Sequence, residues 1–344
     1  MKTKEIGSEF LLEKINSKKI SKEYEKCLFL ENGRQCYKVL NDKLKGKILF
    51  PAYACESMIQ NIGKDRIIYY DVDYNLDIDF HSISDEDINS AEAFVYINYY
   101  GFSQSKKNLE KIQKLKEKNI LIVEDITHSA FSGFEFIGDV LICSIRKWFG
   151  IEGLGILYTN KFDFTDLEFC DENTFSSLRY KGFMEKESFL NGKDVNKIYL
   201  ETFANAEDYA NHFMEISRST SAAMCRFYNY DYEQMIKKRR ENYLFLEKNL
   251  LTNNVYQIKK LNQETPLFFP VYAKHRDDLR QYLIKNNIFC PIHWPKLDSI
   301  DSHFAVHQLL DNILSIPIDQ RYDINDMTRI IETITDFYEN DEFS

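Results

Sequence analysis

The sequence ILIVEDITHSAFSGFEFIGDVLICSIRKWFGIEGLGILYTN occupies residues 120–160, and the rest of the predicted fold is organised around it. It opens with an apolar, β-branched run, Ile120–Val123, which is typical of a buried strand and is followed closely by Asp125. A second predicted strand, Asp139–Ile142, leads toward Lys147. Asp125 and Lys147 therefore each lie at the carboxyl end of a predicted strand, and ligands bind at that edge of open α/β sheets.

An aspartate and a lysine at one sheet edge suit the chemistry of pyridoxal phosphate. This cofactor takes a lysine amine for its covalent attachment and an acid against its pyridinium nitrogen. Residue types and spacing leave a simpler interpretation open for each residue. Lys147 could be a surface lysine that follows a strand, and Asp125 could be the N-cap of a helix.

Several residues of this stretch follow one another in the order and at the intervals of a known family. They are Asp125, His128, Gly138-Asp139, Ser144, Lys147 and Gly153-Leu154-Gly155. The stretch resembles the DegT/DnrJ/EryC1/StrS sugar aminotransferases, which are fold type I pyridoxal-phosphate enzymes. The resemblance implies an α/β fold with a large domain, built on a mainly parallel seven-stranded sheet flanked by helices, and a small C-terminal α+β domain. We expect the large domain over 1–204, with an N-terminal arm, and the connecting helix and small domain over 205–344.

The same resemblance implies roles for individual side chains. Lys147 would hold the cofactor and move a proton as general base and acid. Asp125 would keep the pyridine nitrogen protonated. His128 would form a hydrogen bond with the phenolic oxygen of the ring, and Ser144 would contact the phosphate.

A turn signal, Asn32-Gly33, precedes a predicted helix over Tyr37–Leu44. A helix N-terminus offers free N–H groups to a phosphate, although the same pattern also fits an ordinary helix start. The resemblance implies that the cofactor phosphate binds here, at Gly33, Arg34 and Gln35. Arg34 stands where the family usually has Thr or Ser.

Other positions depart from the family pattern. Cys55 stands where an aromatic side chain would stack on the pyridine ring, and Tyr53 or Tyr100 could replace it or belong to the core. The family's Asn-x-Arg motif, which reaches the neighbouring subunit's cofactor, is missing near 217–219. His293 lies in a segment similar to the family's substrate-proximal region and is either a substrate contact or a packing residue.

The remaining pattern alternates strands with helices, which implies right-handed crossovers and a mainly parallel sheet. Further large-domain elements are predicted at 27–30, 47–53, 54–62, 67–72, 94–100, 106–118 and 155–160. Residues 204–250 have a helical pattern that places Arg239-Arg240 on a solvated face. The predicted small domain has strands at 267–272 and 289–294 and helices at 277–286 and 324–338, and the segment 313–317 precedes the last helix.

Composition excludes several classes of protein. With 344 residues, 44% of them hydrophobic, the chain can bury a sizeable core. The net charge of −10 without a basic block argues against nucleic acid or a membrane surface as the main partner. Seven cysteines without a CxxC pair predict neither a disulfide framework nor a zinc site. With no apolar signal core at the N-terminus, a cytoplasmic location is expected.

The sequence leaves three functional hypotheses. The first is an aminotransferase that moves an amino group from glutamate to a nucleotide-linked keto-sugar for bacterial surface polysaccharide, acting as a homodimer. The second is a pyridoxal-phosphate enzyme acting on a small phosphorylated ketone or an amino acid, by transamination or decarboxylation. The third is a catalytically idle relative with a binding role. A nicotinamide-binding enzyme is disfavoured because no GxGxxG follows a strand.

Overall fold

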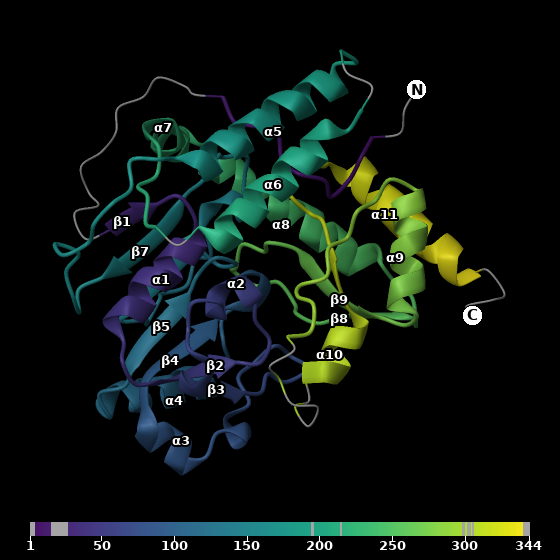
Figure 1. Ribbon diagram of the computed structural model, residues 1–344. Coiled ribbons are helices and arrows are strands. Elements are labelled where there is room, and N and C mark those ends of the chain that lie inside the picture. The colour runs from purple at the N-terminus through teal and green to yellow at the C-terminus, as the bar shows by residue number, and fades with distance from the viewer. Residues whose placement is uncertain are drawn as a thin grey trace.

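The computed structural model describes residues 4–14, 27–193, 196–213, 215–297, 300, 304 and 306–339. Its centre is a seven-stranded sheet in the order β1-β7-β6-β5-β4-β2-β3 (Figure 1). The strands are β1 (Cys27–Leu30), β2 (Lys47–Pro51), β3 (Ile67–Tyr70), β4 (Ala91–Ile97), β5 (Leu121–Asp125), β6 (Val140–Ser144) and β7 (Gly155–Thr159). The five strands from β6 to β3 run parallel, whereas β7 and β1 pair antiparallel. The predicted mainly parallel seven-stranded sheet is confirmed.

Helices and short 3-10 turns connect these strands. The helices of this part are α1 (Gly33–Lys43), α2 (Glu56–Ile59), α3 (Asp85–Ser90) and α4 (Lys106–Glu117), and the turns are η1 (Lys64–Arg66), η2 (Phe80–Ser82), η3 (Tyr99–Gly101) and η4 (Ile145–Lys147). Two sequence predictions need correction. The first helix begins at Gly33 because the Asn32 side chain caps it by accepting from the Gln35 N–H. The predicted helix over 54–62 is a single turn.

An antiparallel helical pair follows the sheet, in a region whose sequence gave no clear pattern. It consists of α5 (Thr174–Leu190) and α6 (Ile198–His212), which lie side by side in Figure 1. The close contact depends on Gly182, where an added Cβ would lie 2.8 Å from the Phe203 ring. The expected domain division after residue 204 stays a prediction, and that position lies inside α6.

The C-terminal part forms a second, smaller layer. A three-stranded antiparallel sheet, β8 (Val255–Gln257), β9 (Phe269–Ala273) and β10 (Ile313–Ile316), packs with α9 (Arg276–Lys285), α10 (Val306–Asn312) and α11 (Ile324–Glu339). The predicted helix over 204–250 is wrong as one element, because α7 (Ser221–Asn229) and α8 (Tyr232–Asn249) start anew at capping residues Thr220 and Asp231. The predicted strand over 289–294 is also wrong. This segment is a loop, and Pro291 has no N–H for a strand ladder.

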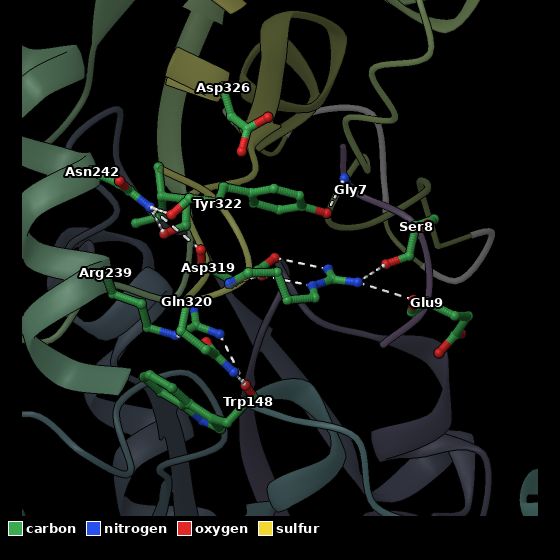
Figure 2. Close-up of polar contacts among 12 residues, drawn as sticks. Gly7, Ser8, Glu9, Trp148, Arg239, Asn242, Asp319, Gln320, Tyr322 and Asp326 are labelled. Atoms are coloured by element: carbon green, nitrogen blue, oxygen red, sulfur yellow. Dashed lines mark hydrogen bonds and ion pairs between the residues drawn. The ribbon is translucent and has the colours of Figure 1, made fainter. Parts of the chain in front are cut away.

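The N-terminal arm, residues 4–14, is bound along the C-terminal part. Arg321 donates from Nη1 to the carbonyl oxygens of Ser8 and Glu9, at 2.8 and 2.9 Å, and Tyr322 Oη accepts from the Gly7 N–H (Figure 2). Gly7 has a φ of 85°, and a Cβ there would overlap the Phe289 carbonyl oxygen at 2.0 Å. Among the described residues, every helix falls short of the length and apolar character that a membrane span needs.

Candidate active site

A cavity of about 220 Å³ opens at the carboxyl edge of the central sheet. The strand ends supply Asp125 from β5 and Ser144 from β6, and the turn after β6 supplies Lys147. The start of α1, the single turn α2, helix α6 and the loop at 293–294 complete the wall. The structure therefore brings Asp125 and Lys147 into one cavity, as their places at predicted strand ends required.

Asp125 is a buried carboxylate held by two hydrogen bonds. Tyr37 Oη donates to Oδ2 at 2.7 Å, and the Thr127 N–H donates to Oδ1 at 2.8 Å. Burial raises the pKa of Asp125, and the two hydrogen bonds oppose that rise. Within the described part of the chain no basic side chain forms an ion pair with it. A cationic ligand group would therefore stabilise its charged form.

Lys147 is half-buried, and its amine has no hydrogen-bond acceptor among the described residues. The adjacent Arg146 guanidinium, together with burial, lowers the pKa of Lys147 to about 8. A lysine with a lowered pKa carries a larger fraction of nucleophilic, neutral amine near neutral pH. This is the electrostatic state that covalent chemistry at a lysine requires.

The turn that carries Lys147 is fixed to its surroundings through Trp148. Trp148 Nε1 donates to the Thr127 carbonyl at 2.7 Å, which ties the lysine turn to the turn after Asp125. The Trp148 carbonyl accepts from Arg239 Nη2 at 3.0 Å and from Gln320 Nε2 at 2.9 Å (Figure 2). Arg239 is only 1% exposed, so its predicted place on a solvated face is wrong.

His128 lies at the cavity wall with its imidazole in a defined orientation. Its Nδ1 accepts from the backbone N–H of Tyr100 at 3.2 Å, so the proton of the neutral ring is on Nε2. Burial, His293 and Lys147 lower the pKa of His128 well below its ordinary value, so the ring stays neutral. Tyr100, whose N–H donates to this ring, has a φ of 56°. His128 thus presents a hydrogen-bond donor to the cavity.

The N-terminus of α1 faces the end of β6. A Cβ added to Gly33 would lie 3.2 Å from the Ser144 Cβ, so the helix start and the serine approach each other closely. Both residues and Asn32 line the cavity. The free N–H groups of the first helical turn and the Ser144 hydroxyl are donors of the kind that bind a phosphate.

A group of five charged side chains, the arginine cluster, adjoins this helix start. It consists of Arg34, Arg146, Arg179, Glu9 and Glu207. Glu207 on α6 pairs with Arg34 Nη2 at 3.0 Å and with Arg146 Nη1 at 2.9 Å, and Glu9 pairs with Arg179 at 3.2 Å. Burial would raise the pKa of Glu207, but Arg146 and Arg34 lower it to about 2. Glu207 is therefore charged at neutral pH and balances the two arginines that it contacts.

Three predicted cofactor contacts do not line the cavity: Gln35, Tyr53 and Tyr100. The Gln35 side chain is buried instead against the backbone of residues 31, 215 and 217, because it satisfies polar groups behind the helix start. Tyr53 and Tyr100 bond to each other at 3.0 Å behind the wall. Their proposed stacking on a cofactor ring is not supported by these positions.

The predicted contacts Gly33, Arg34, His128, Ser144 and His293 do line the cavity. Sequence reasoning missed others, namely Thr127, Arg146, Glu207 and Trp294. Thr127 lies within the Asp125–His128 motif and Arg146 precedes Lys147, so proximity in sequence could have identified both. Glu207 comes from a helix that had no motif, and its place follows only from how α6 packs.

No family model matches the sequence, and no curated protein matches it. Solved structures do match the fold. They include the sugar aminotransferase CalS13 from Micromonospora echinospora, with 14% identity, a TM-score of 0.63, and coverage of 90% of this chain and 87% of that chain. A DegT DnrJ EryC1 StrS aminotransferase from Brucella abortus has 15% identity, a TM-score of 0.62, and coverage of 91% and 86%. Helicobacter pylori PseC, an aminotransferase involved in the biosynthesis of pseudoaminic acid, has 12% identity, a TM-score of 0.64, and coverage of 91% and 86%. The chain has the fold of these aminotransferases.

Proposed function

We propose that this protein is a pyridoxal-phosphate-dependent sugar aminotransferase of the DegT/DnrJ/EryC1/StrS type. It would move an amino group from glutamate to a nucleotide-linked keto-sugar in bacterial surface polysaccharide synthesis. One observation carries the proposal. A nucleophilic lysine, a buried aspartate and a cationic helix start share one cavity. The residues that line the cavity fit the cofactor at both of its ends.

The charge of the arginine cluster fits the phosphate. Its three arginines carry three positive charges against two negative charges from Glu9 and Glu207, and Lys147 lies beside the cluster in the same cavity. Partly buried surplus charge is unfavourable unless a partner balances it. A phosphate ester contributes about −1.5 to −2 charges at neutral pH, so it has the sign that would balance this positive surplus. Gly33, Ser144, Arg34 and Arg146 would hold it.

The surroundings of Asp125 fit the pyridine nitrogen. Its carboxylate already accepts from Tyr37 and Thr127, and each carboxylate oxygen has a further lone pair for a pyridinium N–H. That cation would offset the burial that raises the pKa of Asp125. His128 Nε2 would donate to the phenolic oxygen of the ring.

When bound, the cofactor supplies an electron sink that stabilises negative charge at the substrate's α-carbon. The chain's own residues do the rest. Lys147 would take and return the proton as general base and acid. Asp125 keeps the sink effective by holding the ring nitrogen protonated. Arg146 keeps the pKa of Lys147 low enough for the amine to accept a proton near neutral pH.

The names of proteins with the same fold support a sugar as acceptor. Glutamate as donor, a nucleotide carrier, a homodimeric assembly and a cytoplasmic location belong to the same proposal and come from the family resemblance. Incubation of the loaded protein with glutamate and candidate nucleotide keto-sugars, followed by mass spectrometry, tests donor and acceptor together. Formation of 2-oxoglutarate with an aminated sugar supports the proposal, whereas release of carbon dioxide from an amino acid favours a decarboxylase.

Attachment of the cofactor is tested by borohydride reduction and peptide mapping. We expect the pyridoxyl mass on Lys147 and its loss in Lys147→Ala without a change in the thermal unfolding temperature. Lys186 is a matched control, because its pKa is likewise lowered to about 8, mainly by burial of its side chain. It lies on α5 and does not line the cavity. A label on Lys186, or none on either lysine, would refute the assignment.

A further inference from the structure

Helix α1 contributes to two ends of the cavity. Gly33 and Tyr37 are four residues apart on this helix, a separation that places them on the same helical face. Both line the cavity, and Gly33 lies beside Ser144 at the end where the phosphate is proposed to bind. The Tyr37 hydroxyl lies at Asp125, with 2.7 Å between Oη and Oδ2. The register of one helix therefore places a hydrogen-bond donor at Asp125 as well as at the phosphate end.

The direction of the hydrogen bond between Tyr37 and Asp125 follows from the chemistry of the phenol. Burial and the nearby Asp125 charge raise the pKa of Tyr37 well above its ordinary value, so the hydroxyl keeps its proton. Both side chains are buried, so water competes little for the contact. Tyr37 is therefore the donor and the carboxylate of Asp125 is the acceptor.

Tyr37 is the strongest of the contacts that keep Asp125 charged. Burial raises the pKa of Asp125, and the hydrogen bond from Tyr37 is the largest influence that lowers it, followed by contacts from Thr127. The Thr127 N–H donates to Oδ1 at 2.8 Å. The Thr127 hydroxyl accepts from the Ser144 N–H at 3.1 Å, which leaves its own proton for Asp125. Each carboxylate oxygen is thus held by at least one donor.

The titratable groups that face Asp125 provide no positive charge. They are Tyr37 and Cys36 on α1, Tyr99 on η3 and Cys143 on β6. Burial raises the pKa of each of them, so all four are neutral near pH 7. Among the described residues, no base acts on the Asp125 carboxyl. Its charge consequently depends on neutral hydrogen-bond donors, of which Tyr37 is the main one.

We propose that Tyr37 is a positioning residue, which keeps the Asp125 carboxylate charged and oriented before a ligand binds, so that the site favours a ligand with a cationic ring nitrogen. The identity of that ligand rests on the proposed function. The effect of Tyr37 on Asp125 does not, because it follows from contacts within the chain. The two can therefore fail separately.

The charge of Asp125 is tested in cofactor-free protein by ¹³C nuclear magnetic resonance between pH 4 and 8. The label is placed on the side-chain carboxyl of aspartate, and Asp125→Asn assigns the signal. In Tyr37→Phe we expect the Asp125 signal to titrate at higher pH than in the unaltered protein. The phenyl ring keeps the packing of Tyr37 against Phe50 and removes only the donor. Equal midpoints in the two proteins would overturn the proposal.

Tyr70→Phe is the matched control. Tyr70 is also a buried tyrosine, and its hydroxyl donates to the Val95 carbonyl at 2.7 Å, but it does not line the cavity. This variant loses a hydrogen bond of the same kind without touching Asp125. We expect the Asp125 midpoint to stay where it is in the unaltered protein. A shift as large as that in Tyr37→Phe would show a general loosening of the fold and contradict a specific role for Tyr37.

The preference for a ring nitrogen is tested with pyridoxamine 5′-phosphate and its 1-deaza analogue, in which carbon replaces that nitrogen. Neither probe has an aldehyde to react with Lys147. At pH 7 the unaltered protein should bind the first probe at least about tenfold more tightly, because only its nitrogen can donate to a charged carboxylate. The ratio of affinities should fall as the pH drops through the pKa of Asp125, since a protonated carboxyl no longer attracts the cation.

The variants separate the possible outcomes. In Tyr37→Phe the fall in the ratio should occur at higher pH, and Asp125→Asn, which has no carboxyl to titrate, should show no fall. A fall at the same pH in Tyr37→Phe and the unaltered protein would overturn the proposal. Binding of neither probe would overturn the ligand preference together with the proposed function, and the titration of Asp125 would then decide the role of Tyr37 by itself.

Discussion

Asp125 and Lys147 derive their chemistry from the residues packed around them. Burial raises the pKa of one and, with Arg146, lowers the pKa of the other. The two pKa shifts favour the uncharged forms of Asp125 and Lys147. A cationic ring nitrogen beside Asp125 would stabilise its carboxylate, and a covalent bond to the cofactor would use the neutral amine of Lys147. Shifted pairs of this kind are typical of active sites.

Asp125→Asn should slow proton transfer while the cofactor still binds. The amide fills the same volume but cannot hold the ring nitrogen protonated, so we expect a loss on the order of 10²-fold or more. The measurement is deuterium exchange at the α-carbon of glutamate, with cofactor content followed by absorbance.

The neighbouring buried carboxylate offers a control. Glu124 bonds to Asn98 and the backbone, so Glu124→Gln should exchange at a near-normal rate per folded molecule. Normal exchange in Asp125→Asn would show that another group faces the nitrogen.

Acetylation of Lys147 in cofactor-free protein should have its midpoint near pH 8, because Arg146 and burial lower its pKa. Arg146→Gln removes the larger cause and should move the midpoint upward, toward the ordinary lysine value of about 10.4. Pulse labelling with acetic anhydride and peptide mass spectrometry resolves Lys147 from other lysines. A midpoint that stays near pH 8 in Arg146→Gln would assign the shift to burial alone.

The same shift has a consequence for stability. Between about pH 8 and 10.4 the unfolded chain holds a proton on Lys147 that the folded protein has lost. The free energy of unfolding rises with pH wherever the unfolded state binds more protons. The contribution of Lys147 to that free energy therefore increases as the pH rises through this window.

At this scale the sequence predicted the residues of the motif and missed those that complete it. Asp125, His128, Ser144 and Lys147 lie within one stretch whose spacing is readable. Glu207 reaches the cavity from a helix some sixty residues later, through packing of α6 that no local pattern encodes. The prediction that Gln35 contacts the cofactor has a related difficulty. Its side chain bonds to the backbone at 215–217, which is remote in sequence.

At the scale of elements, strands were predicted better than helices. The buried strands are short apolar runs bounded by turns, and all seven strands of the large sheet were recognised. The helical region over 204–250 was predicted as one helix although Thr220 and Asp231 were visible as capping residues. The loop at 289–294 has a β-rich composition because Cys290, Ile292 and Trp294 pack in or against the core, whereas Pro291 has no N–H for a ladder.

Helix α8 supports the lysine turn through Arg239, and this support can be measured. Arg239 donates to the carbonyls of Leu267 and Trp148, at 2.8 and 3.0 Å, with its guanidinium 4.9 Å from the Trp148 ring. Arg239→Met removes these donors from buried carbonyls and should lower the free energy of unfolding by about 1–3 kcal/mol. Denaturant titration gives that value, and pyridoxyl labelling of Lys147 reports whether the turn is still in place.

Arg240→Met provides the matched comparison. The guanidinium of Arg239 is buried, whereas Arg240 is half-exposed and donates to the carbonyls of Glu264 and Asn262 in a solvent-accessible turn. We expect a loss of about 0.5 kcal/mol or less and unchanged labelling. Equal losses of unfolding free energy in the two variants would show that the contacts of Arg239 to Trp148 and Leu267 stabilise the fold no more than the surface contacts of Arg240.

In the whole molecule, parts far apart in sequence meet at one sheet edge. The arm contributes Glu9, the α5–α6 pair contributes Arg179 and Glu207, and the C-terminal part contributes His293 and the Arg239 contact. Figure 1 shows the helical pair lying across the same side of the molecule as the N-terminal arm. This convergence explains why the fold was predictable from one stretch and the complete site was not.

The helical pair also leaves apolar side chains on the surface, including Leu190 and Leu200 with exposed fractions of 51% and 53%. Single exposed leucines are ordinary, but two on neighbouring helices that border the site fit the homodimer that the family resemblance implies. We expect light scattering to give a mass about twice 40.8 kDa across a dilution series. Leu200→Lys should shift the protein toward monomer, and Leu251→Lys, at a position 84% exposed outside this pair, should not.

If subunits complete each other's sites, cofactor retention should fall as Leu200→Lys dissociates. A monomer that keeps its cofactor at every concentration would instead show that the arginine cluster holds the phosphate within one chain.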